Sequence, residues 1–329
     1  MGEVVINEAI KWQKRGLIYA PNGSIKWQKH FAMLPTPLLL DSLTLRVYLG
    51  FCDDDNVGRI GYVDVNPNNP KEILKISKEP VLDIGEKGCF DDNGVVPISI
   101  LKKDKEIYLY YIGFQLGVKV PYFMFCGLAI SKDNGNTFTR FSKSPILDRV
   151  NDEVYARCGV NVIKDDDKFR MWYVASYKQG WTMAQGKLKP FYIMKTTESS
   201  DGIHWNDKPI QCFEYKNNDE HGFGRPFVWK ENGRYKMYYS IRTYSRGYYI
   251  GYAESDNGIN WDRQDERAGI GLSKEGWDSE NLSYPYIIDV AGGGQIMLYN
   301  GNGCGKSGFG YAELVNEVGE KRANLLPKG

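Results

Sequence analysis

The sequence predicts an all-β fold, a five-bladed β-propeller that forms a single domain over residues 1–329. Three observations lead to this prediction. The chain is 14% aromatic and contains 23 Tyr and 36 Gly, so it is rich in residues that favour strands and turns. Short strands centred on tyrosine recur at a spacing of about 60 residues. Units of three or four antiparallel strands repeated at such a spacing are typical of propellers.

Five tyrosines mark the middle strand of each repeat. They stand 63, 62, 66 and 60 residues apart, at Tyr48, Tyr111, Tyr173, Tyr239 and Tyr299. An apolar strand and a polar turn precede the middle strands, and the Asn-Gly pair in the turn at residues 231–234 is a strong hairpin signal. The last repeat lacks an outer strand, which residues 16–20 are predicted to supply. The predicted blades span residues 27–70, 80–141, 144–207, 217–263 and 275–315.

Three repeats carry a glycine followed three residues later by an aromatic residue. These pairs are Gly135 and Phe138, Gly202 and Trp205, and Gly258 and Trp261. Because the pattern recurs in phase with the repeat, we expect the aromatic ring to pack between neighbouring units, which is a structural role.

Charge and hydrophobicity argue against several classes of function. The 42 Lys and Arg balance 41 Asp and Glu, which disfavours binding to nucleic acid or to a membrane surface through bulk electrostatics. The longest apolar stretch, around residues 32–40, is far shorter than the ~20 residues of a spanning helix. Residues 1–29 show no secretory signal. The six cysteines form no C-x-x-C pair, as expected for free thiols in a reducing compartment, so a cytoplasmic location is predicted.

Titratable residues recur where each blade is predicted to begin. They lie 18 to 20 residues before the five tyrosines and are His30, Asp92, Glu153, His221 and Glu280. The innermost strands of a propeller begin around one central funnel, where such side chains converge. Asp92, Glu153 and Glu280 are therefore predicted to be catalytic, because carboxylates in one pocket can divide acid and base work. The alternative is that they cap strand ends or tie blades together.

Two arginines follow these positions at a spacing of four residues. Arg157 follows Glu153, and Arg225 follows His221, so each pair lies on one face of an extended strand. The planar guanidinium suits carboxylate or phosphate. Together with His221 and His30, the arginines predict a site for an anionic substrate group or for phosphate. Alternatively, each arginine pairs with a neighbouring carboxylate.

Further binding residues are expected around the same funnel. Asp91 precedes Asp92 in the sequence Phe-Asp-Asp-Asn-Gly, and Tyr155 and Tyr284 could stack on sugar rings. Residues 179–189, which include Trp181, read as a long polar loop inside the third blade that could cover the pocket as a lid. No metal site or cofactor is predicted, because the Asp-rich turns are expected to be solvated and no phosphate-binding loop is present.

The sequence resembles the five-bladed propeller glycosidases of glycoside hydrolase families 43, 32 and 68, with the family 130 phosphorylases as neighbours. The similarity rests on the turns at Ser200–Trp205 and Ser255–Trp261, the Tyr-Tyr middle strands and the acidic blade starts, and it covers nearly all five units. Families 43 and 32 carry an Asp at the start of the first blade, where this chain has His30 instead. The Arg and His content is more similar to family 130, whose phosphorylases hold phosphate with such residues.

A second, smaller resemblance concerns residues 131–138, Ser-Lys-Asp-Asn-Gly-Asn-Thr-Phe, which fit the Asp-box pattern of sialidases. This motif is a structural turn, and sialidases usually have six blades and an arginine triad, so a sialidase is kept only as a minor alternative.

The leading functional prediction is a glycoside hydrolase-like enzyme that cleaves a glycosidic bond with carboxylates in the central funnel. Its partner would be an oligosaccharide or glycoconjugate, including an anionic one. A phosphate-dependent glycoside phosphorylase is the alternative within the enzymes. A non-hydrolytic propeller that binds a sugar or nucleotide-sugar in surface polysaccharide assembly is the alternative outside them. The oligomeric state is left open.

Overall fold

The computed structural model describes residues 10–290 and 293–315. Nearly all of its regular structure is β-sheet, in agreement with the predicted all-β class. The helical segments are short, and they are η1 (Lys26–Gln28), η2 (Asp265–Arg267) and α1 (Asn302–Gly305).

Three of the sheets have four antiparallel strands each. The first contains β2 (His30–Asp41), β3 (Thr44–Cys52), β4 (Gly58–Asn66) and β5 (Asn69–Ile76). The second contains β14 (Glu220–Glu231), β15 (Arg234–Thr243), β16 (Gly247–Ser255) and β17 (Asp262–Arg263). The third joins the two ends of the chain, with β18 (Ser283–Val290), β19 (Gly294–Asn300), β20 (Phe309–Leu314) and β1 (Trp12–Tyr19). The N-terminal strand expected near residues 16–20 is β1, which pairs with β20.

The fourth sheet has eight strands. They are β6 (Val95–Lys103), β7 (Glu106–Leu116), β8 (Tyr122–Ser131), β9 (Thr139–Arg140), β10 (Ala156–Asp165), β11 (Lys168–Ala184), β12 (Lys187–Ser199) and β13 (Ile210–Gln211). Its two halves, β6–β9 and β10–β13, are each antiparallel, and a short parallel ladder of two residue pairs between β8 and β10 joins them.

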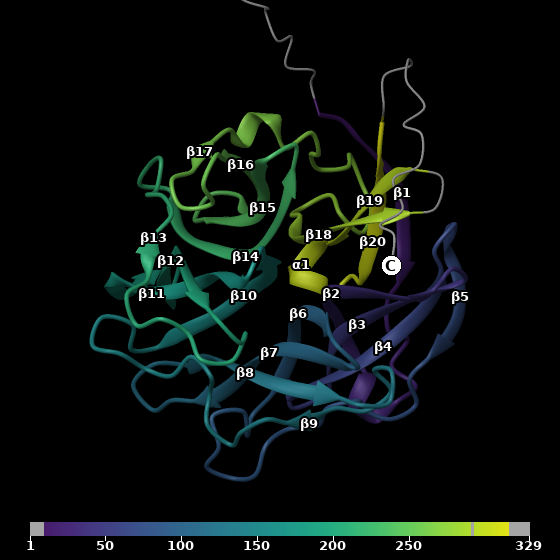
Figure 1. The fold of residues 1–329 in the computed structure, drawn as a ribbon, viewed down its shortest axis with the longest axis horizontal. Helices are drawn as coiled ribbons and strands as arrows, with labels where there is room; N and C mark the ends of the chain where they lie inside the picture. The colour runs from purple at the N-terminus through teal and green to yellow at the C-terminus, as the bar shows by residue number, and fades with distance from the viewer. Residues whose placement is uncertain (1–9, 291–292, 316–329) are drawn as a thin grey trace, which may run out of the picture.

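The sheets are arranged around a common centre, with the first strand of each repeat innermost (Figure 1). Each of these strands contacts the next, so that β2 meets β6, β6 meets β10, β10 meets β14, β14 meets β18, and β18 meets β2. The turns are those that the sequence chemistry favours. Between β14 and β15, for example, Asn232 and Gly233 have φ of 50° and 79°, the left-handed geometry that an Asn-Gly hairpin turn requires.

The five repeated tyrosines are fully buried in the middle strands β3, β7, β11, β15 and β19. Their hydroxyls need partners, since a buried polar group without a hydrogen bond is costly. The Tyr48 hydroxyl donates to the carbonyl of Gly135 at 2.8 Å, and the Phe138 ring packs edge-on against Tyr48 at 5.5 Å. The glycine turn of one unit is therefore fastened to the preceding unit, as the sequence predicts.

The same contact recurs along the chain. The Tyr110 hydroxyl donates to the Gly202 carbonyl at 2.8 Å, and the Trp172 indole donates to the Gly258 carbonyl at 2.9 Å. These glycine-turn contacts join repeats that are consecutive in the chain.

Candidate active site

Glu153, predicted to be catalytic, is only 1% exposed and is paired on all sides. Its carboxylate lies 2.6 Å from Arg157 and 2.6 Å from Lys195, and it accepts a hydrogen bond from the Tyr173 hydroxyl at 2.9 Å. Two cations and a hydroxyl saturate its oxygens. This environment favours a structural role, in which the carboxylate anchors the start of β10 to the middle and third strands.

Buried carboxylates of this kind recur in four of the repeats. Asp91 accepts from Tyr111 and pairs with Arg140, Glu220 pairs with Arg263 through two bonds of 2.9 Å, and Asp278 accepts from Tyr299 and pairs with Lys14. They stand 19 to 21 residues before the repeated tyrosines, one or two positions away from most of the predicted set. In four repeats, therefore, a buried carboxylate near the predicted position ties the blade start to a cation, which is the structural alternative given above.

Asp92 and Glu280 differ from these carboxylates. Asp92 is partly buried next to the start of β6, and its side chain accepts a hydrogen bond from the Gly88 amide at 2.8 Å. Glu280 is exposed, and its backbone amide donates to Asn302. Neither is ion-paired within residues 10–290 and 293–315, where no hydrogen bond or ion pair joins any two of Asp92, Glu153 and Glu280. Of the three predicted catalytic carboxylates, Asp92 is therefore the one that is partly buried and has no ion pair in the described ranges.

The predicted anion-binding residues lie in different environments. His30 is exposed and lies 3.1 Å from Asp54. Arg157 pairs with Glu153, which matches the alternative given for it above. Arg225 is 1% exposed and donates to Thr36 at 2.8 Å and to the Ile98 carbonyl at 3.3 Å, so it binds the inner strands to one another. Burial lowers the pKa of Arg225 to about 9.

Arg242, at the end of β15, is the cation that sequence reasoning missed. Its guanidinium lies 4.9 Å from the centre of the Tyr192 ring and 5.4 Å from that of Tyr248. Its Nε is buried without a hydrogen-bond partner, and no carboxylate pairs with it in the described part of the chain. Arg242 replaces the aromatic or small side chain found three residues after the tyrosine in other repeats, such as Phe114 or Ser176.

Three predicted residues lie around Arg242. Tyr284 packs against Tyr248 with ring centres 5.8 Å apart, and Tyr155 packs against Tyr192 at 6.2 Å. His221 is 3% exposed and stacks on Tyr244 at 4.5 Å. Burial and the positive charge of Arg242 lower the pKa of His221 to about 4, so its imidazole is neutral at pH 7.

Further groups complete this cluster, which we call the Arg242 cluster and define by Arg242, Tyr192, Tyr248, Tyr284 and His221. Cys304, in α1, lies close to Tyr284 and Tyr248, and burial raises the pKa of its thiol. The cluster forms where β15 ends and where β14, β16 and β18 begin. A partly exposed guanidinium among phenol hydroxyls and a neutral imidazole can bind an anion through charge-assisted hydrogen bonds.

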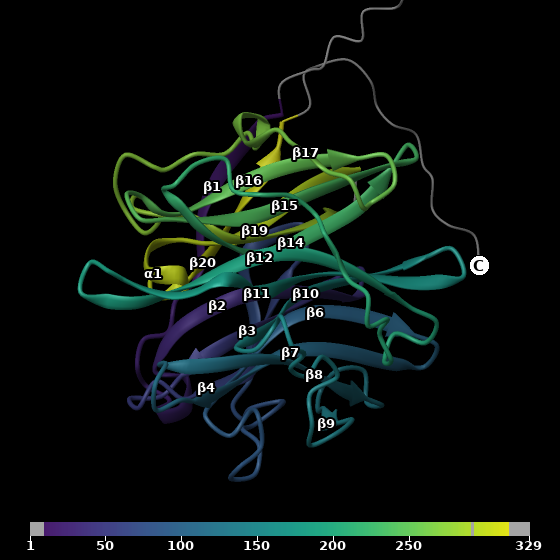
Figure 2. The ribbon, with the colours of Figure 1, turned by 90° about the vertical axis from the view of Figure 1, so that its left-hand side faces the viewer.

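Residues 179–189 form a hairpin and not the predicted polar loop. β11 continues to Ala184, β12 starts at Lys187, and Trp181 is paired with Pro190 in the ladder. Figure 2 shows the hairpin projecting beyond the other sheets. The Trp181 ring packs on Tyr122 at 5.3 Å and on Tyr155 at 5.4 Å, while the Tyr155 hydroxyl donates to the Phe191 carbonyl. The sequence missed the strands because lysines and glutamine mask their apolar alternation.

No three His, Cys, Asp or Glu side chains are grouped to hold a metal ion in the part of the chain that the structure describes. No helix among those residues has the length and apolar character needed to cross a membrane.

Known proteins resemble this chain in both sequence and fold. The glycoside hydrolase 130 family model, described as beta-1,4-mannooligosaccharide phosphorylase, matches residues 90–321. An uncharacterized protein of Mycobacterium tuberculosis is 34% identical over 305 residues, which cover 93% of this chain and 99% of the relative.

Solved glycosidase structures share the fold at low sequence identity. A structure titled "Glycoside hydrolase" covers 97% of this chain and 96% of its own, with a TM-score of 0.71 and 18% identity. The match to a thermostable family-43 glycoside hydrolase covers 94% of this chain and 99% of that structure, with a TM-score of 0.65 and 17% identity. An endo-arabinase from Bacteroides thetaiotaomicron covers 93% and 100%, with a TM-score of 0.62 and 12% identity.

These comparisons confirm the resemblance to the glycosidase propellers and their family 130 neighbour. The function class expected from the sequence, a glycoside hydrolase-like enzyme or a glycoside phosphorylase, is that of the matching family. The chain belongs to glycoside hydrolase family 130.

Proposed function

We propose that this protein is a phosphorylase that cleaves a β-mannosidic bond of an oligosaccharide with inorganic phosphate. The observation that carries the proposal is Arg242, a guanidinium surrounded by aromatic rings with no carboxylate partner among the described residues. A guanidinium that is partly removed from water and has no counter-charge can be neutralised by a bound anion, so an anionic reactant would be bound there. The description of the matching family supports this choice of reaction and substrate.

Each residue of the Arg242 cluster has a role in this proposal. Arg242 and the Tyr248 and Tyr284 hydroxyls hold the phosphate, and neutral His221 adds a hydrogen bond without a competing charge. A phosphate oxygen attacks the anomeric carbon, and the bond from that carbon to the leaving sugar oxygen breaks. Asp92 has the role of the general acid that gives a proton to that oxygen in glycosidic cleavage. The products are a sugar 1-phosphate and a shortened oligosaccharide.

Phosphorolysis is preferred to hydrolysis because of the carboxylates. Two carboxylates on opposite sides of the bond are the usual requirement of a hydrolase. Here Glu153 is saturated by cations, whereas Asp92 is partly buried and has no ion pair within the described residues. Phosphate brings its own nucleophilic oxygen, so one carboxylic acid is sufficient.

The test is to incubate the protein with β-1,4-mannooligosaccharides with and without phosphate and to follow sugar 1-phosphate by ³¹P NMR. We expect product only with phosphate, and loss of product in Arg242→Ala and Asp92→Asn. Arg15→Ala is the matched control, because Arg15 is an exposed arginine on β1 that pairs with Glu313 on β20. Cleavage at equal rates without phosphate would indicate a hydrolase and refute the proposal.

We also infer that the sheets form a single domain of five blades. The eight-stranded sheet then counts as two blades, β6–β9 and β10–β13, because only a two-residue ladder joins them. The pairing of β1 with β20 and the contact of β18 with β2 support closure of the ring by the N-terminal strand. The six free cysteines, four of them buried, support the predicted cytoplasmic location.

A further inference from the structure

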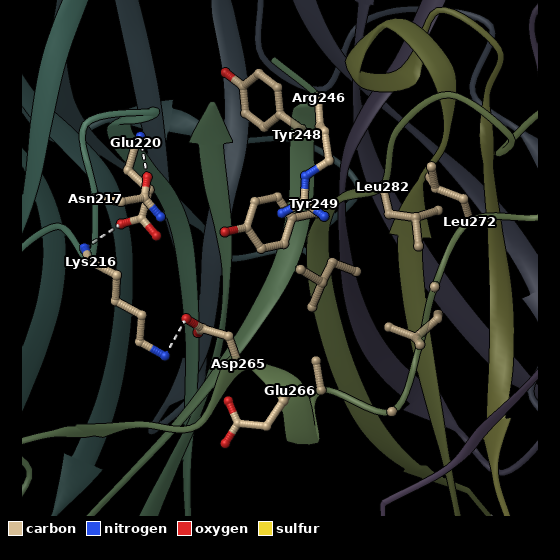
Figure 3. A pocket seen from close by; sticks show the side chains of 15 residues that line it. Lys216, Asn217, Glu220, Arg246, Tyr248, Tyr249, Asp265, Glu266, Leu272 and Leu282 are labelled. Carbon is tan, nitrogen blue, oxygen red and sulfur yellow. Dashed lines mark hydrogen bonds and ion pairs between the residues drawn. The ribbon is translucent and has the colours of Figure 1, made fainter. Parts of the chain in front are cut away.

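A groove lies beside the Arg242 cluster, between the sheet of β14–β17 and the first strand of the next sheet. Its volume is about 560 Å³, within the range of small-molecule sites. Its walls are the residues before β14, the start of β16, and the segment from Asp265 to Leu272 (Figure 3). None of these residues belongs to the Arg242 cluster except Tyr248.

The two walls of the groove differ in chemistry. Figure 3 shows Lys216, Glu220 and Asp265 on one side and Leu272 and Leu282 on the other. Most charged side chains of the first wall are neutralised by ion pairs. Lys216 pairs with Asp265 at 3.0 Å, and Glu220 is neutralised by Arg263. The groove is therefore close to neutral, and it is apolar along one side.

Three polar side chains in the groove remain available. Arg246 stacks over the Tyr249 ring at 4.7 Å, and both side chains reach into the groove (Figure 3). Glu266 is exposed at the far end of the groove. No hydrogen bond or ion pair joins the guanidinium of Arg246, the hydroxyl of Tyr249 or the carboxylate of Glu266 to another residue in the described ranges. The groove therefore has hydrogen-bond donors and a hydrogen-bond acceptor available for a ligand, opposite an apolar wall.

A sugar ring matches this arrangement, because it presents C–H groups on its faces and hydroxyls along its edge. Tyr248 connects the groove to the Arg242 cluster, since its ring packs on Tyr284 and it also lines the groove. We propose that the groove binds distal units of a neutral oligosaccharide whose reacting end lies at Arg242. This inference rests on the proposed function for the position of the reacting end.

A blocking variant can test the groove without strain. Gly271 lines the groove, its φ lies outside the left-handed region, and a Cβ added to it would meet open space. Gly271→Trp should therefore fill the groove while the fold is kept. Lys274→Trp is the matched control, because Lys274 is an exposed residue just after this segment and does not line the groove. Glu266→Gln is a milder second variant.

The experiment measures binding of linear β-1,4-mannooligosaccharides of two to six units by calorimetry in the absence of phosphate, so that no turnover is needed. We expect the wild type and Lys274→Trp to bind the hexasaccharide at least tenfold more tightly than the disaccharide. Gly271→Trp should lose this gain but keep the disaccharide affinity. In Glu266→Gln the affinity for the hexasaccharide should fall a few-fold.

The inference is overturned if wild-type affinity does not grow with chain length, if Gly271→Trp retains the growth, or if only anionic oligosaccharides bind. Its failure can be separated from that of the proposed function. Length-dependent binding lost in Gly271→Trp supports the groove even if phosphate proves irrelevant. Phosphorolysis of the disaccharide with no gain from length supports the reaction and refutes the groove.

Discussion

Glu153 is a fully buried charged side chain and Arg242 a partly buried one, and their surroundings differ. Glu153 is met by two cations and a tyrosine hydroxyl, whereas Arg242 is met by aromatic rings and by no carboxylate in the described chain. Glu153 has counterparts in other repeats, and Arg242 has none. The difference teaches that in a repeated fold a recurring charge belongs to the scaffold, and a charge that breaks the repeat marks the place for a ligand.

The largest expected effect is on the scaffold. Glu153→Gln leaves Arg157 and Lys195 without their counter-charge, and breaking such a buried pair costs about 3–5 kcal/mol of the free energy of unfolding. Chemical denaturation measures this loss. Glu106→Gln is the control, because its ion pair with Lys132 is exposed, and there we expect a change within about 1 kcal/mol. A Glu153→Gln protein with wild-type stability and no activity would restore the catalytic role predicted from the sequence.

Removal of Arg242, the cation without a carboxylate partner in the described chain, should lower the rate of reaction and leave the stability nearly unchanged. In Arg242→Met the phosphorolytic rate should fall by about 10²–10³, the range seen when a charge-stabilising donor is removed from an active site. The free energy of unfolding should stay within about 1 kcal/mol or increase, because the variant no longer holds an uncompensated charge. Rate assays and denaturation of one preparation give both values. A large loss of stability would show that Arg242 serves the scaffold after all.

The fold was predictable because every repeat solves the same packing problem. Each unit buries aromatic side chains in its middle strand. The hydroxyl of Tyr48 bonds a glycine-turn carbonyl and those of Tyr111 and Tyr173 bond carboxylates at the blade starts, so the tyrosine spacing follows the architecture. The hairpin at residues 179–189 was missed because it belongs to one repeat alone. Its strands are stabilised by Trp181 packing on Tyr122 and Tyr155, a tertiary contact that no local pattern displays.

The site was less predictable for the same reason. Alignment of the repeats finds what the repeats share, and Asp91 and Glu153 share a role in anchoring blade starts. Arg242 follows the uncharged run 237–241 in β15, where a charge could have been noticed as an exception to its neighbours. That signal identifies a residue to inspect, but the lack of a counter-charge depends on side chains from other strands and is visible only in three dimensions.

The coupling between Arg242 and His221 gives the next prediction. The pKa of His221 is about 4 in the folded protein and about 6.5 when unfolded. Between these values the unfolded chain binds the proton and the folded protein does not, so stability should fall by about 3 kcal/mol as the pH drops from 6.5 to 4. Above pH 6.5, His221 does not contribute to the pH dependence of stability. His221→Asn should flatten the dependence between pH 4.5 and 6.5.

NMR can check the source of that shift, because the chain contains only three histidines. In Arg242→Met part of the electrostatic cause is gone, so the ring protons of His221 should titrate at a pH closer to 6.5. An unchanged titration would mean that burial alone lowers the pKa and that the two residues are not coupled.

The smallest effect concerns a contact that repeats. Tyr110→Phe removes the hydrogen bond to the Gly202 carbonyl and should lower the free energy of unfolding by about 1 kcal/mol. Tyr19→Phe is the matched control, since the Tyr19 hydroxyl makes no hydrogen bond within the described residues, and there we expect less than about 0.5 kcal/mol. Thermal denaturation of both variants gives the comparison. Activity should be unchanged in each, because a glycine-turn contact stabilises the scaffold at a distance from Arg242. A Tyr110→Phe variant that stays stable but loses activity would contradict the division between repeated and unrepeated residues.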